Sequence, residues 1–159
     1  MRSALVSLAA LGLLAAVGCA PSGLDVDEAK NVAEADGLRV QVQLPGRYFK
    51  TGQKIRVAVT ATNTTGKPIE IHSPTGAPVL VRITRQTLLS PEQVRVYPGS
   101  ATANILSWTL PAGQSRTFVL RVPVEPDWPV EELLHLSAEL NGYGHLAPAV
   151  TVFIQSPRK

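Results

Sequence analysis

Apolar and polar residues alternate in short runs from residue 38 to residue 156. In residues 38–44, leucine and valine occupy every second position, and arginine and glutamine lie between them. Because successive side chains of a strand point to opposite faces of a sheet, this alternation predicts a strand with one buried face. Further runs of this kind are residues 54–62, 68–72, 79–84, 94–97, 105–110, 116–122, 133–140 and 149–154.

Turn-forming residues separate these runs. Glycine, proline and asparagine gather between them, for example in residues 63–68, 98–100, 111–113 and 141–144. About nine short strands spaced by such turns are typical of a sandwich and not of a helical domain. We therefore expect an all-β fold, a single antiparallel immunoglobulin-like β-sandwich, with Trp108 as the core tryptophan between its sheets.

The N-terminal stretch differs from these runs. Arg2 precedes 14 uncharged residues, Ala4 to Val17. This is shorter than a membrane span of about 20 apolar residues, but it fits the apolar region of a secretion signal. The run Ala16-Val17-Gly18-Cys19 resembles the lipobox of bacterial lipoproteins. The resemblance implies a cleaved signal peptide at residues 1–18 and a lipid on Cys19; the alternative is a buried N-terminal helix.

The segment after Cys19 is acidic and weakly patterned. We predict that residues 19–37 form a flexible tether, with a transient helical turn around residues 28–35. The β-sandwich domain then covers residues 38–156. Removal of residues 1–18 leaves 159 − 18 = 141 residues, which is enough for one domain with its own core.

Charge is unevenly distributed along the chain. Residues 37–122 carry eleven lysines and arginines against two acids, a net charge of 11 − 2 = +9. Most of these basic residues alternate with apolar ones, which favours a solvated sheet face over a surface for polyanions. Anionic head groups and cell-wall polymers stay open as partners, whereas nucleic acid does not fit an exported, anchored protein. The single cysteine excludes an internal disulfide.

Two segments resemble a known family, the BsuPI-like intracellular proteinase inhibitors. The first is a strand, an asparagine-based turn with Lys-Pro, and a second strand; the other is a strand followed by a Pro-x-Gly turn. The matching residues are Asn63, Thr65, Lys67, Pro68, Leu110, Gly113 and Ser115. The resemblance implies an immunoglobulin-like fold and a protease-inhibiting activity, with the Ser73–Pro78 loop as the expected contact.

Catalytic signatures are missing from the sequence. It contains no HExxH, CxxC, GxGxxG or phosphate-binding glycine-lysine motif. His135 and His145 flank one predicted hairpin near Glu139, so a metal-dependent hydrolase stays open as a remote alternative. Exposed histidines are the favoured interpretation, and we expect no enzyme activity, no cofactor and no metal.

Two short segments are candidates for binding a partner. Trp128 and Asp127 lie between prolines and acids, and an exposed tryptophan there is a hot-spot candidate. The alternative is a tryptophan that folds back over the edge of the core. The second segment is the proline-flanked loop Ser73, Pro74, Thr75 and Gly76.

These features together predict a non-catalytic, lipid-anchored protein of the bacterial envelope. It would be monomeric, held extracytoplasmically on the periplasmic face or the cell surface by the lipid on Cys19. Its sandwich loops would bind or scaffold an envelope protein or a protease. A BsuPI-like protease inhibitor is the first alternative.

Overall fold

The computed structural model describes residues 29–100 and 103–156, which form strands and turns. The predicted signal peptide and Cys19 lie outside the described residues. No helix that could cross a bilayer occurs among the residues described. The strands are β1 (Ala29–Ala35), β2 (Leu38–Leu44), β3 (Tyr48–Lys50), β4 (Lys54–Asn63), β5 (Ile69–Ser73), β6 (Val79–Gln86), β7 (Pro91–Tyr97), β8 (Leu106–Leu110), β9 (Ser115–Pro123), β10 (Leu133–Leu140) and β11 (Ala149–Gln155).

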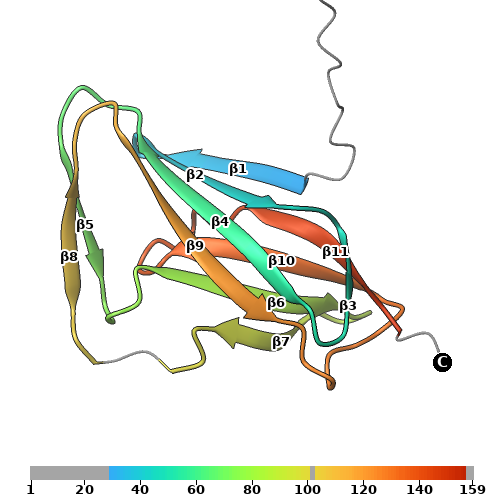
Figure 1. Ribbon diagram of the computed structural model, residues 1–159. Coiled ribbons are helices and arrows are strands. Elements are labelled where there is room, and N and C mark those ends of the chain that lie inside the picture. Colours follow the sequence, from blue (N-terminus) through green and yellow to red (C-terminus); the bar gives the residue numbers. More distant parts are fainter. Residues whose placement is uncertain (1–28, 101–102, 157–159) are drawn as a thin grey trace, which may run out of the picture.

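The strands build two facing sheets and a small ribbon (Figure 1). One sheet has the order β1-β2-β4-β9, and the other has the order β3-β11-β10-β6-β7. The ribbon consists of β5 and β8. The predicted all-β sandwich is therefore confirmed, and every strand expected from the alternation is present.

One pairing departs from the antiparallel pattern. The short strand β3 pairs parallel to β11, with Phe49 opposite Ile154. Both side chains are buried, so β3 extends the second sheet at its edge. A run of three residues is too short for alternation to be recognised, which is why the sequence analysis missed β3.

The domain begins earlier than the sequence predicted. Residues 29–35 form β1, which pairs with β2 along its whole length, from Ala29 opposite Leu44 to Ala35 opposite Leu38. The boundary at residue 38 and the helical turn at residues 28–35 are therefore wrong. The inward positions of β1 hold alanine, whose small side chain gives a weak apolar pattern, although Ala29 is fully buried.

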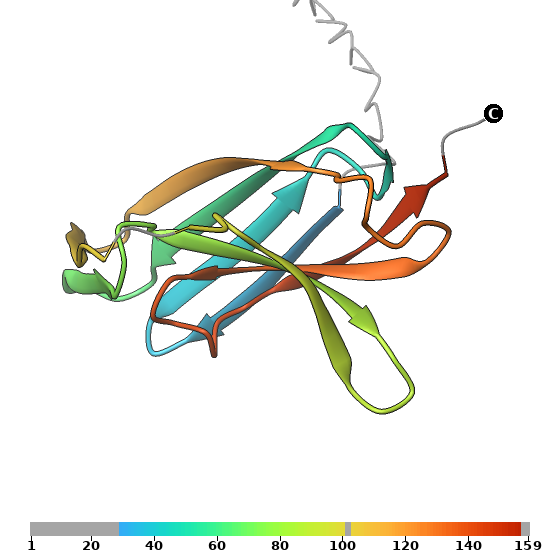
Figure 2. The same ribbon diagram turned by 90° about the horizontal axis from the view of Figure 1, so that it is seen from below.

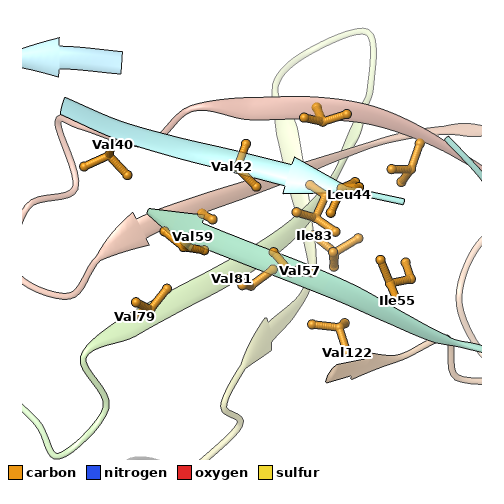
Figure 3. Packing of buried hydrophobic residues seen from close by; sticks show 14 of the residues in the cluster. Val40, Val42, Leu44, Ile55, Val57, Val59, Val79, Val81, Ile83 and Val122 are labelled. Atoms are coloured by element: carbon orange, nitrogen blue, oxygen red, sulfur yellow. The ribbon is translucent and has the colours of Figure 1, made fainter. Parts of the chain in front are cut away.

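The core lies between the two sheets (Figure 3). Val57 and Val59 of β4 face inward, and Val81 and Ile83 of β6 face them from the other sheet. All four side chains are fully buried. Each such side chain contributes about 1.5–3 kcal/mol when it leaves water, so this interior is the main source of stability.

Trp108 packs against the edge of this interior and does not lie between the two main sheets. It is on the ribbon strand β8, where it is half-buried and its ring meets the Phe118 ring edge-on at 5.5 Å. The prediction that Trp108 is the core tryptophan between the sheets is therefore wrong. Alternation places a residue on a face, but it does not reveal that β5 and β8 leave the main sheets to form a separate ribbon.

Asn63 connects the first sheet to the ribbon. Its side chain is fully buried at the end of β4, and its Nδ2 donates to the carbonyls of Lys67 (2.7 Å) and Leu110 (2.9 Å). Its Oδ1 accepts from the backbone N–H (2.9 Å) and the hydroxyl (2.7 Å) of Thr65. All hydrogen-bonding positions of this buried amide are satisfied, as burial requires.

Replacement of Asn63 by alanine should lower the free energy of unfolding by about 2–3 kcal/mol, because it leaves buried carbonyls without donors. Urea denaturation measures this loss. Thr64→Ala, at the exposed neighbour, is the matched control and should change stability by less than about 0.5 kcal/mol. Equal effects of the two substitutions would show that the Asn63 amide does not hold the turn.

Candidate functional site

The two long sides of the sandwich differ. On one side, β1 of the first sheet is linked to β11 of the second, since Asn31 Nδ2 donates to the Ala149 carbonyl at 2.8 Å. On the other side, the edge strands are β9 and β7. A groove of about 760 Å³ runs between these two edges. The open side is therefore the candidate functional site.

The walls of this groove are mainly apolar. Phe118 and Leu120 of β9 line it and are only half-buried, and Val79 and Tyr97 lie across from them. Val119, the residue between the first two, is 49% exposed. Phe118 forms a groove wall because β9 has a neighbouring strand on one side only.

The backbone of β9 has hydrogen-bonding groups that β4 does not use. Asn63 N–H donates to the Gln114 carbonyl at 2.9 Å, in line with the register that pairs Thr62 with Ser115. In an antiparallel pair, every second residue turns its N–H and C=O toward the partner strand. Since Gln114 faces β4, so do the even-numbered residues of β9. The backbone N–H and C=O groups of Thr117, Val119 and Arg121 therefore point to the unpaired edge.

A polar cluster bridges the two sheets at one end of the groove. Arg95 of β7 donates from Nε to Glu125 Oε2 at 2.9 Å and also pairs with Asp127. The Tyr97 hydroxyl donates to Glu125 Oε1 at 3.0 Å. The Tyr97 ring lies against the Trp128 ring, with 6.3 Å between their centres. These contacts fix the segment after β9 to the edge of the other sheet.

Burial and, to a smaller extent, the hydrogen bond to Glu125 together raise the pKa of Tyr97 from 10.0 to about 12. The phenol therefore remains a neutral donor to the Glu125 carboxylate throughout the physiological range.

Trp128 is part of the core. It is 3% exposed, so the predicted exposed hot spot is wrong, and the alternative of a tryptophan folded back over the core is the one observed. The backbone N–H of Trp128 donates to the Glu125 carbonyl at 3.1 Å. This bond closes the turn that directs the ring inward. Asp127 is exposed, but its carboxylate is engaged by Arg95.

The predicted loop of residues 73–76 lies at the opposite part of the groove, where Gly76 is a lining residue. Ser73 is fully buried and Pro74 is exposed. Asn141 Nδ2 donates to Thr75 Oγ1 at 2.6 Å and to the Ala77 carbonyl at 2.9 Å. The structure thus brings Gly76 to the groove, whereas Ser73 is buried and its hydroxyl has no hydrogen-bond partner among the described residues.

The histidines have separate partners. His135 lies within β10 beside the Thr151 hydroxyl at 3.4 Å, and His145 faces Asp36 at 3.7 Å. Across residues 29–100 and 103–156, no three His, Cys, Asp or Glu side chains gather in a way that could hold a metal ion.

Some of the basic residues lie on the outer face of the first sheet. Arg56 and Arg121 are exposed and directly opposite each other on β4 and β9. This agrees with the expected solvated face. Like charges in such cross-strand positions repel, so the pair does not stabilise the sheet.

Comparison with known proteins gives no family. The sequence matches no family model and no curated protein. A β-glucosidase from Listeria innocua, in complex with gluconolactone, is similar over 81% of this chain and 16% of its own, with 13% identity and a TM-score of 0.45. Spo0M, a sporulation control protein from Bacillus subtilis, is similar over 77% of this chain and 51% of its own, with 11% identity and a TM-score of 0.48. This chain thus spans only part of these proteins, and likeness at this level carries no conclusion about activity.

The raised pKa of Tyr97 makes a prediction about alkaline stability. The folded protein holds the phenol proton more tightly than the unfolded chain, so this contribution is complete below pH 10 and is lost as the pH rises toward 12. In Tyr97→Phe, the decline of the free energy of unfolding over this interval should be shallower, as measured by urea denaturation. Tyr48→Phe, at an exposed tyrosine, is the control and should keep the wild-type slope.

Proposed function

We propose that this chain is a non-catalytic, lipid-anchored protein of the bacterial envelope that binds an extended segment of a partner protein in the groove between β9 and β7. The observation that carries the proposal is the unpaired edge of β9 beside an apolar groove. The lipobox at residues 16–19 supports the anchor.

An edge strand can pair with an added strand through its main chain, and neighbouring pockets then select the side chains of the added segment. Here the free backbone N–H and C=O groups of Thr117, Val119 and Arg121 supply such an edge. The half-buried Phe118 and Leu120 would receive every second side chain of the added strand. A binding segment would therefore be extended and apolar at alternate positions.

The ends of the groove support a fixed site. Asn141 holds the Thr75–Ala77 loop at one part, and Arg95 with Glu125 holds the other. Because these walls are ordered before binding, less conformational entropy is lost when a segment docks.

Substitution of Val119 by proline tests the binding mode. Proline removes one N–H from the unpaired edge, whereas the bonds to β4 come from the neighbouring residues and stay intact. With a photo-crosslinking residue in place of Thr117, the wild-type protein should crosslink in intact envelopes to one segment of a single protein. Val119→Pro should abolish this crosslink.

Val119→Thr is the matched control, because it keeps the N–H and a β-branched side chain, and it should keep the crosslink. Thermal unfolding of both variants checks that the sandwich is intact. A crosslink that survives in a folded Val119→Pro protein would overturn binding through the β9 edge.

The anchor is tested separately at Cys19. The wild-type protein should incorporate labelled palmitate and sediment with membranes, whereas Cys19→Ser should do neither, because the thiol that carries the lipid is lost. Equal labelling of the two proteins would refute lipid attachment at Cys19 and leave the groove proposal to its own test.

A protease inhibitor is the second candidate function. It is favoured by the way Asn141 braces the loop that carries the exposed Pro74, since a rigid loop suits a protease cleft. A crosslink from Pro74 to a protease, together with slowed hydrolysis by that protease, would favour this function over the groove.

A further inference from the structure

The turn between β6 and β7 presents two leucines to solvent. Leu88 and Leu89 are fully exposed, with relative exposures of 104% and 96%. The turn is nevertheless ordered: the Thr87 N–H and hydroxyl both donate to the Ser90 carbonyl, at 3.3 and 2.6 Å. Figure 2 shows the hairpin projecting from the body of the sandwich. The leucines therefore form an apolar tip on a defined protrusion.

Charges at the base of the hairpin are paired. Arg85 Nη2 lies 2.6 Å from Glu92 Oε2, and Arg85 Nη1 lies 3.7 Å from Glu132 Oε2. Residues 86–91, between the two strands, contain no charged side chain. Entry of this tip into an apolar medium would thus not require the desolvation of an ion.

Along the long axis of the sandwich, the tip lies toward the end at which β1 begins, although the hairpin projects away from the sheet that contains β1 (Figure 2). Ala29 opens β1 at the end toward which the β6 arrow points (Figure 1). The exposed side chains of Tyr48 and Leu133, at 65% and 63%, lie at the same end, on either side of the Phe153 position. Exposed apolar side chains thus gather on the second sheet, at the end that carries this hairpin.

We propose that Leu88 and Leu89 insert into the surface of the lipid bilayer and hold the domain in a fixed orientation on it. This rests on the anchored part of the proposed function, namely a lipid on Cys19. Ten residue steps separate Cys19 from Ala29, which limits the distance between their Cα atoms to about 35 Å. The tether therefore keeps the tip close to the membrane and raises its effective concentration there.

A bilayer fits the tip better than a protein surface does. Two side chains on a convex turn bury far less than the roughly 800 Å² per partner of a stable protein interface. Membrane contacts are among the sites that exposed apolar patches mark. The paired charges at the base also imply that insertion does not depend on anionic lipids.

A tryptophan reporter tests the proposal in the native, membrane-extracted protein. Leu89→Trp places the reporter at the tip, and Ala112→Trp places it in the exposed β8–β9 turn at the opposite end. The proteins are reconstituted into phosphatidylcholine vesicles with brominated acyl chains, which quench tryptophan within the bilayer. The unsubstituted protein gives the background from Trp108 and Trp128.

We expect the reporter at residue 89 to lose most of its emission and the reporter at residue 112 to lose none. Adding Leu88→Asp to Leu89→Trp should restore the emission, because a charge at the tip opposes insertion. Equal quenching of the two reporters would overturn the proposal. The proposal would also be overturned if, without lipid, the tryptophan at residue 89 became shielded from solvent as the protein concentration rises. A second copy of the protein would then cover the tip.

Flotation of the same vesicles separates this inference from the anchor. Protein that floats with an unquenched tip reporter refutes insertion alone, whereas protein that does not float refutes the lipid on Cys19. In the second case the unmodified Cys19 thiol is coupled to a maleimide lipid, and the tip is measured in the same way.

Discussion

The two sheets are held together only by non-covalent contacts, since the chain has a single cysteine, Cys19, outside the described domain. The interior must therefore exclude water at both ends without the help of a cross-link. Trp128 does this at one end, and its ring is fixed by Tyr97, whose hydroxyl is held by Glu125. The demand for apolar burial explains why a tryptophan set between prolines and acids turns inward.

An unpaired edge beside an apolar groove creates a risk as well as a site. Two copies of such an edge can pair with each other and aggregate. The charges along β9 oppose this outcome, because Arg116 and Arg121 on this strand and Arg56 beside it are all basic. Pairing of two identical edges would bring these charges together, whereas an acidic or neutral segment would not meet the same repulsion.

Alternation predicted every strand whose two faces differ clearly in polarity. It missed β1, whose inward residues are small, and β3, which is too short to show a period. The site was harder to predict. The sequence pattern of β9 would be the same with one neighbouring strand or with two, so only the strand order reveals the groove. Asp127 and Gly76 were found near the groove because turn residues mark strand ends, where edges and loops meet. Leu88 and Leu89 were not predicted as surface residues, because leucine is normally buried.

Strand β1 has a mechanical consequence. It is the first described strand after the proposed anchor, and it is held by its ladder to β2 and by the Asn31 contact to β11. A force between the membrane and a partner bound at β9 would act on β1 before any other strand. Because an edge strand can peel away one residue at a time, β1 would yield first and add about 3.3 Å of reach per residue. Ala29 would leave the core while the facing side chains of β4 and β6 stayed packed, so the loss of β1 would lengthen the tether without opening the sandwich.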